Sequence, residues 1–390
     1  MRRTEWLQET RMLRFEEAFA GWTEKRLTQE EAARLLGVCA RTFRRYVDRF
    51  EDGGLDGLAD KRLSQVSSRC APTDEVLRLE TLYRESYQGW SVAHFHDMYR
   101  DRHAGERSYT WVKNRLQAAG LVSKGKRRGT PRRKRDRAPI PGLLLHQDGS
   151  PHEWVAGAQW DLIVTMDDAT SEVYSGFFVE EEGTWSSFRG VRETLSKRGL
   201  FSSLYTDRGS HYWHTPVAGG KVDKANPTQF GRAMAELGVE MIPPYSPEAR
   251  GRSERWFETV QGRLPKELAL EGIAAMPEAN AYLRESFWPR MNRRFGVEAA
   301  APGSAFVPLG DVGLDDILCL KAERTVTRDN CVDYRGRQLQ LPVGHGRHYV
   351  KRRVRVHEHA DGTLSVFHGP RRLARYHGGA PAEPMPLAAG

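Results

Sequence analysis

The sequence predicts a multidomain protein of class α plus α/β plus β. Apolar residues recur at helical spacing before residue 124, and β-rich runs alternate with helical segments from 142 to 300. Short strands separated by Gly, Pro and Asp-Gly signals follow. Because 390 residues exceed a typical domain, we expect several domains. Their predicted bounds are two helical domains at 1–70 and 71–123, a basic linker at 124–141, an α/β domain at 142–300, a small β-barrel at 301–377 and a disordered tail at 378–390.

The first helical domain has the pattern of a helix-turn-helix. Thr28 is a predicted N-cap with Glu31 at capping-box spacing, and Gly37 separates this helix from a second, basic helix. The second helix of such a unit reads the DNA groove, although a helical hairpin with solvated arginines would show the same pattern. The residues expected on DNA are Arg41, Arg44 and Arg45.

A second reader is predicted between residues 109 and 121. Trp111, Val112, Leu116 and Leu121 form its apolar face, and we expect Lys113 and Arg115 to contact DNA. Two such units in tandem would read a longer DNA site than one unit does. His94 and His96 lie among apolar residues without a nearby cysteine pair, so we interpret them as packing or surface histidines rather than metal ligands.

The charge of the chain is concentrated in the linker. Residues 124–137 hold nine basic residues and one acid, which is +8 of the formal net charge of +9. This segment has too many like charges and prolines to fold alone, and we expect it to bind DNA phosphates. The linker residues expected on DNA are Lys126, Arg127, Arg128, Arg132 and Arg133.

Cysteine usage and hydropathy limit the cellular setting. Four scattered cysteines without a CxxC pair predict reduced thiols and argue against a zinc knuckle or a disulfide framework. Apolar runs stay shorter than a membrane span, and the first residues lack a signal-peptide core. We expect a cytoplasmic, nucleoid-associated protein with no membrane partner.

Three carboxylates carry the predicted chemistry of the α/β domain. The predicted order βββαβαβα describes a mixed five-stranded sheet, with Asp148 and Asp207 where two strands stop and Glu254 in an arginine-rich helix. Carboxylate oxygens suit Mg²⁺ or Mn²⁺, and paired ions serve in-line phosphoryl transfer. We therefore predict a site for two such ions.

Other acids near these three have simpler interpretations. Asp167 and Asp168 end the second strand and could share the site, but turn or capping roles are favoured. Glu258 follows Glu254 by one helical turn and is expected in a surface ion pair, while Glu248 is a candidate helix cap.

Basic and aromatic residues surround the predicted site. The arginines near Glu254 are expected either to hold the DNA backbone or to form solvated helix surface: Arg250, Arg252 and Arg255. Tyr212, Trp213 and His214 either stack on unpaired bases or pack in the core. In the C-terminal domain, VKRRVRV predicts valines facing inward and basic residues facing outward.

The segments HQDGS, YTDRGS and PPYSPEARGRSERWF resemble the catalytic motifs of bacterial insertion-sequence transposases of the retroviral-integrase superfamily. The similarity extends to the domain layout and covers residues 20–375, without the HHCC zinc module of retroviral integrases. It implies an RNase H-like core with Asp148, Asp207 and Glu254 as the metal-binding DDE triad. It further implies that Asp148 contacts both ions, while Asp207 and Glu254 each contact one.

The same resemblance implies an activity and partners. A protein of this kind binds the terminal inverted repeats of its transposon, hydrolyses the 3′ ends and transfers them to target DNA, as a homodimer or higher oligomer. A DNA-binding regulator that does not cut, and an RNase H-type nuclease that cuts without joining, stay open as alternatives.

Overall fold

The computed structural model describes residues 3–59, 70–125, 135–217, 220–244, 247–343, 348–377 and 380–381. It divides into two compact units, Met1–Thr81 and Leu82–Gly390. Within the described ranges, no helix is both long enough and apolar enough to cross a membrane.

The first unit contains the predicted helix-turn-helix. Its helices are α1 (Arg3–Thr23), α2 (Gln29–Leu35) and α3 (Ala40–Leu58). The Thr28 hydroxyl accepts a hydrogen bond from the Glu31 backbone, and the Glu31 carboxylate accepts one from the Thr28 backbone, so the capping box is present. Gly37 has a φ of +68°, which a glycine adopts without strain in the turn before α3. Phe15 packs with Phe43 from α3 in the core of this unit.

A second helical group follows, as the sequence predicts. It comprises α4 (Thr73–Ser86), α5 (Val92–His103) and α6 (Tyr109–Ala118). Ser91 and Ser108 cap the N-termini of α5 and α6 by accepting hydrogen bonds from backbone amides. The predicted apolar positions Val112 and Leu116 of α6 are fully buried.

The α/β domain is built on a five-stranded mixed sheet with strand order β3-β2-β1-β4-β5. Its strands are β1 (Leu144–Val155), β2 (Ala158–Asp167), β3 (Val173–Val179), β4 (Ser203–Tyr205) and β5 (Glu240–Ile242). The helices between and after them are α7 (Thr184–Arg198), α8 (Gln229–Glu236) and α9 (Pro247–Gln261). β1 pairs antiparallel with β2 and parallel with β4, so the element order is the predicted βββαβαβα.

Asp148 does not end its strand, which corrects the sequence prediction. β1 continues through Gly149, Ser150 and Pro151 to Val155, because its antiparallel ladder with β2 extends that far. Asp148 therefore lies in the middle of β1, opposite Val164 of β2.

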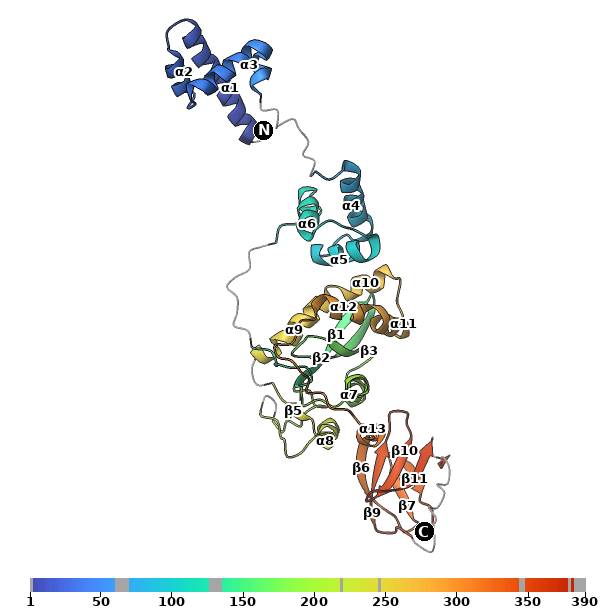
Figure 1. The fold of residues 1–390 in the computed structure, drawn as a ribbon. Coiled ribbons are helices and arrows are strands. Elements are labelled where there is room, and N and C mark those ends of the chain that lie inside the picture. The colour runs from blue at the N-terminus through green and yellow to red at the C-terminus, as the bar shows by residue number, and fades with distance from the viewer. Residues whose placement is uncertain are drawn as a thin grey trace. The chain divides into compact units, whose positions relative to one another are not determined.

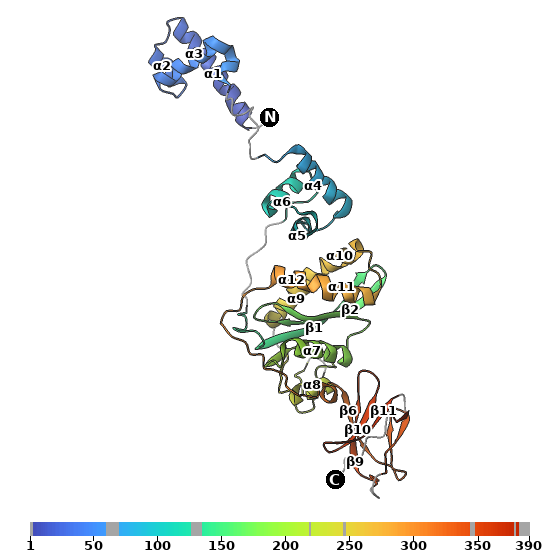
Figure 2. The same cartoon turned by 45° about the vertical axis from the view of Figure 1, so that its right-hand side comes forward.

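Two hydrophobic cores cover the two faces of the sheet. Leu145 and Leu204 pack on one face with Phe188 of α7 and Phe230 of α8. The other face packs against α9 and the helices that follow it, as Figures 1 and 2 show. Those following segments are α10 (Leu264–Leu270), α11 (Met276–Tyr282), a π-helical turn (Leu283–Phe287) and α12 (Trp288–Phe295). Neighbouring residues of β1 therefore face different cores.

The edge strand β3 is covered by side chains of these helices. The Asn280 amide accepts a hydrogen bond from the Phe178 backbone N–H at 2.6 Å and donates one to the Phe178 carbonyl at 3.1 Å. Asn292 makes the same pair of bonds with Val173, at 2.9 and 3.0 Å. Two asparagines thus pair with the edge of the sheet much as a neighbouring strand would.

The C-terminal domain is an open sheet rather than the predicted barrel. After α13 (Leu314–Ile317), five strands pair in the order β12-β11-β10-β9-β6, and β7 pairs with β8 in a separate ribbon. Their bounds are β6 (Leu320–Thr325), β7 (Cys331–Tyr334), β8 (Arg337–Gln340), β9 (Arg353–Glu358), β10 (Leu364–His368), β11 (Arg371–His377) and β12 (Ala380–Pro381). Among the described residues, β6 and β12 end the larger sheet without pairing with each other, so nothing closes a barrel. The predicted alternation in β9 is confirmed, with Val354 and Val356 buried and Arg353 and Arg355 exposed.

Candidate active site

Asp148 and Asp207 are brought together by the parallel pairing of β1 and β4. The last paired residues are His146 and Tyr205, and each acid lies two residues further along its own chain segment. Both acids line one small depression, and Ser253 of α9 lines it with them. The structure therefore places two of the three predicted acids at one point of the sheet.

The Asp207 carboxylate is oriented by the turn that follows it. The backbone N–H of Gly209 donates to Asp207 Oδ1 at 2.8 Å. A Cβ at position 209 would lie 2.9 Å from the same oxygen, so a side chain there would crowd the carboxylate. Thr206, the residue before Asp207, is also held in place, because the indole N–H of Trp213 donates to Thr206 Oγ1 at 3.0 Å.

Glu254 lies beside this depression on α9. Its neighbour Ser253 is buried and lines the depression, whereas Glu254 is exposed. Across the part of the chain that the structure describes, no three His, Cys, Asp or Glu side chains gather closely enough to hold a metal ion. The structure thus gathers Asp148 and Asp207, and it does not bring Glu254 into a group of three with them.

Glu182 is a further carboxylate near this site that the sequence did not predict, although it does not line the depression itself. It follows β3, and a Cβ on Gly149 would lie 2.2 Å from its Oε2 atom, so Glu182 packs directly against the residue after Asp148. Tyr212 Oη donates to Glu182 Oε1 at 3.3 Å. His211 Nε2 lies 3.4 Å from that oxygen, within ion-pair range but not aligned for a hydrogen bond. The available signal was the run of three glutamates at positions 180–182, directly after a predicted strand.

Tyr212 is kept protonated beside these acids. Burial raises the pKa of its phenol well above the usual value, and the negative charges of Glu182, Asp148 and Asp207 raise it further. The phenol stacks edge-on against Phe230 with ring centroids 5.0 Å apart. Tyr212 and Trp213 are both buried, which supports core packing over base stacking for these two. His214 is half exposed.

Asp167 has the predicted turn role, whereas the Asp168 carboxylate bonds to residues far from it in the sequence. Asp167 accepts hydrogen bonds from the backbone N–H groups of Gly142 and Thr170, at 2.8 and 2.9 Å. Asp168 accepts from Ala138 N–H at 2.7 Å and contacts His146 Nε2 at 2.8 Å. Neither acid lines the depression that holds Asp148 and Asp207.

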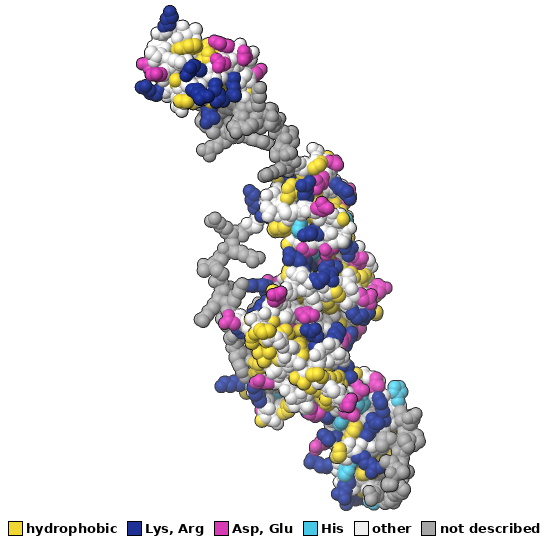
Figure 3. All heavy atoms as spheres, in the orientation of Figure 1, with side chains coloured by type: hydrophobic (Ala, Val, Ile, Leu, Met, Phe, Trp, Pro, Cys, Tyr) yellow, Lys and Arg dark blue, Asp and Glu magenta, His cyan; other side chains and the backbone are white. Residues whose placement is uncertain are grey.

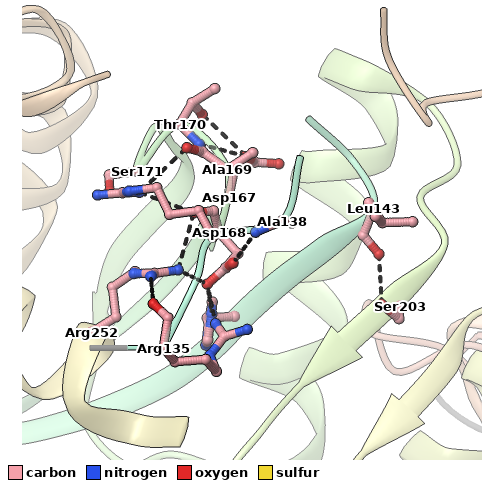
Figure 4. Close-up of polar contacts among 12 residues, drawn as sticks. Arg135, Ala138, Leu143, Asp167, Asp168, Ala169, Thr170, Ser171, Ser203 and Arg252 are labelled. Atoms are coloured by element: carbon pink, nitrogen blue, oxygen red, sulfur yellow. Dashed lines mark hydrogen bonds and ion pairs between the residues drawn. The ribbon is translucent and has the colours of Figure 1, made fainter. Parts of the chain in front are cut away.

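Two arginines also pair with Asp168. Figure 4 shows Arg135 and Arg252 converging on its carboxylate. Burial by itself raises the pKa of Asp168, but the hydrogen bonds from His146 and Ala138 and the charge of Arg252 hold that pKa well below its usual range. Asp168 is therefore a buried, ionised carboxylate.

The predicted DNA-contact residues have different surroundings. Arg41, Arg44 and Arg45 are exposed on α3, and Figure 3 shows Lys and Arg side chains gathered on the visible face of this unit. Lys113 and Arg115 are half-buried on α6. Arg252 is turned to Asp168, and Arg255 is exposed. The side chains outside the described residues are those of Lys126, Arg127, Arg128, Arg132, Arg133 and Arg250.

Comparison with known proteins identifies the family. Residues 21–75 match the winged helix-turn-helix family, a range that includes α2 and α3. Over 348 residues the chain is 30% identical to y4bF of Sinorhizobium fredii, whose name describes it as a transposase, and the match spans 87% of this chain and 75% of y4bF. The chain belongs to the insertion-sequence transposases. The transposase is also 30% identical over 162 residues to the transposase for insertion sequence IS1202 of Streptococcus pneumoniae, covering 42% of this chain and 35% of that one.

Solved structures of retroviral integrases are also similar to the transposase. The HTLV-2 integrase catalytic core domain in complex with magnesium matches with 15% identity and a TM-score of 0.29, over 38% of this chain and 87% of that one. A chain of the simian T-cell lymphotropic virus intasome matches with 14% identity and a TM-score of 0.34, over 76% of this chain and 95% of that one. Because both TM-scores are low, the family is assigned from the sequence relatives alone.

Proposed function

We propose that the transposase is a polynucleotidyl transferase of the DDE type with an RNase H-like core. It hydrolyses the 3′ ends of its transposon and joins them to target DNA. One observation carries this proposal: Asp148 and Asp207 lie side by side beyond the last β1–β4 pair, next to the helix that carries Glu254. Acids on adjacent central strands and on a neighbouring helix suit the positioning of a phosphodiester.

The donor set fits a hard divalent cation. Asp148 and Asp207 offer carboxylate oxygens at one depression, which are the ligands that Mg²⁺ prefers. We infer that they hold two ions together with Glu254. When bound, such ions supply activation of the attacking oxygen and stabilisation of the leaving oxygen.

The residues of the chain orient this site and the DNA. Gly209 N–H fixes one oxygen of Asp207, and the neutral Tyr212 phenol holds Glu182 against β1. Exposed arginines on α3 contact the terminal repeats, and α6 and the basic linker extend this contact. We propose that a homodimer or higher oligomer pairs the two transposon ends, because joining both ends to one target needs two sites.

The test is Mg²⁺-dependent nicking and strand transfer on DNA that carries the element's own ends. We expect wild type to cut and join, and Asp207→Asn to bind the ends normally but to do neither. End binding without cutting by either protein would favour a DNA-binding regulator. Cutting without joining would favour an RNase H-type nuclease, and equal activity of both proteins would show that Asp207 is not a member of the site.

Glu182→Gln is expected to raise the Mg²⁺ concentration for half-maximal nicking by about 10-fold, or about 1.4 kcal/mol. The substitution removes a negative charge that packs against Gly149, next to Asp148, and that charge favours cation binding. The matched control is Glu181→Gln, which removes an equal charge from the exposed residue before it. A Mg²⁺ titration of nicking checks both variants. Equal shifts in the two would refute a specific role for Glu182.

A further inference from the structure

The Asp168 carboxylate joins α9 to β1 and to the segment just before β1, both of which are distant from α9 in the sequence. It is fully buried at the turn after β2. Arg135 and Ala138 reach it from the end of the basic linker, and Arg252 reaches it from α9 (Figure 4). His146 reaches it from β1. A buried carboxylate with several charge-assisted partners holds those partners in place, because losing any one of them leaves charge unpaired.

Two of these partners stand next to the proposed catalytic acids. His146 precedes Asp148 by two residues on β1, and strand alternation puts both on the same face of the sheet. Arg252 precedes Glu254 by two residues on α9. One carboxylate therefore bonds to the strand of the first acid and to the helix of the third.

The turn around Asp168 is itself held by further hydrogen bonds from the backbone and from Arg137. The Asp168 N–H donates to the Leu144 carbonyl at 3.0 Å, and Arg137 donates to the Asp168 carbonyl at 3.0 Å and to Ser171 Oγ at 2.8 Å. Arg252 also donates to the Arg135 carbonyl at 3.1 Å. The backbone of Asp168 is thus bonded to β1, while its carboxylate bonds to α9.

We propose that Asp168 is a positioning residue that ties α9 to β1 and so sets the place of Glu254 relative to Asp148. This inference rests on the proposed function of the two acids. Because Arg135 belongs to the predicted basic linker, the same carboxylate also connects the linker to α9. Asp168 itself touches neither the depression nor DNA in this role, and it acts only through Arg252 and His146.

The experiment compares Asp168→Asn with Asp167→Asn in the full chain. Both acids are fully buried in one turn, but Asp167 bonds to Gly142 and Thr170, and among the described residues it has no hydrogen bond or ion pair with α9. Three quantities are measured for each protein: end binding, the strand-transfer rate at saturating DNA and Mg²⁺, and amide hydrogen exchange of α9. We expect Asp168→Asn to slow strand transfer at saturation by 10-fold or more, with end binding within 2-fold, and to speed exchange in α9.

Asp167→Asn should leave exchange in α9 as in wild type. Arg252→Gln provides a second variant with a partly exposed side chain, for use if Asp168→Asn does not fold. Arg252→Gln should slow strand transfer as Asp168→Asn does. The double variant should transfer strands no more slowly than the slower single variant, because both substitutions break the same interaction.

Two outcomes would overturn the proposal. Unchanged α9 exchange in Asp168→Asn and Arg252→Gln would show that the ion pair does not hold the helix. Losses of activity that add in the double variant would show that the two residues act separately. Hydrogen exchange does not depend on catalysis, so an inactive wild type would count against the proposed function and leave this readout intact.

Discussion

Glu254→Gln is expected to reduce strand transfer by about 10³-fold while leaving binding to the transposon ends unchanged. An amide cannot supply the negative charge that a divalent cation needs, and a loss of about 4 kcal/mol of transition-state stabilisation corresponds to that factor. Glu254 is exposed on α9, so the substitution should leave the fold intact. Single-turnover strand transfer at saturating DNA measures the effect.

Glu258→Gln is the matched control for this substitution. Glu258 lies one helical turn after Glu254 and is exposed like it, so both changes remove one charge from the same helix surface. We expect Glu258→Gln to retain nearly full activity. Loss of activity in Glu258→Gln with retention in Glu254→Gln would assign the third acid to position 258.

Glu267→Ala is expected to destabilise the fold by about 3–5 kcal/mol, because it leaves buried charged groups without a partner. Glu267 is almost fully buried on α10, where it contacts His94 Nε2 at 2.7 Å and accepts from Tyr282 Oη at 2.7 Å. Arg290 pairs with the same carboxylate. Urea unfolding followed by tryptophan fluorescence measures the loss, since Trp90 stacks on His94.

The matched control for this prediction is Glu271→Ala, one turn later. Glu271 pairs with Arg102, but both side chains are about one-third exposed. A solvated pair contributes little, so we expect a loss below about 1 kcal/mol. Equal losses at both positions would contradict the assignment of a buried network to Glu267.

This network also predicts how stability depends on pH. Burial alone raises the pKa of Glu267, but the hydrogen bond from His94 and the charge of Arg290 lower it overall. A carboxylate with a lowered folded-state pKa stabilises the fold above its unfolded pKa of about 4.3, and this stabilisation is lost as the pH falls. The difference in unfolding free energy between wild type and Glu267→Ala should therefore be full near pH 7 and shrink below pH ~4.

Local features of the structure were predictable from the sequence. The capping box of Thr28 and Glu31 and the turn at Gly37 depend on residues within one helical turn of each other, so residue type and spacing suffice to find them. The mixed sheet was equally predictable, because each strand and helix has its own apolar period. The parallel pairing of two acid-bearing segments followed from that order of elements.

Features that depend on distant residues were not predictable. The apolar run that ends at Asp148 suggested the end of a strand, but pairing with β2 carries β1 on to Val155. Asp168 meets Arg252, 84 residues away, and Glu182 meets Tyr212, 30 residues away. No periodicity encodes such contacts. The prediction of a barrel was wrong for the same reason. The alternation of apolar and polar residues predicts strands, but it does not predict whether the first and last strands pair.

The asparagine pairs on β3 have a consequence for self-assembly. An open sheet edge is a template on which another chain can add a strand, and such growth leads to aggregates. Asn280 and Asn292 already occupy the outward backbone groups of Phe178 and Val173, so this edge offers no template at those residues. The backbone of β3 is therefore protected at these two residues from pairing with a strand of another molecule.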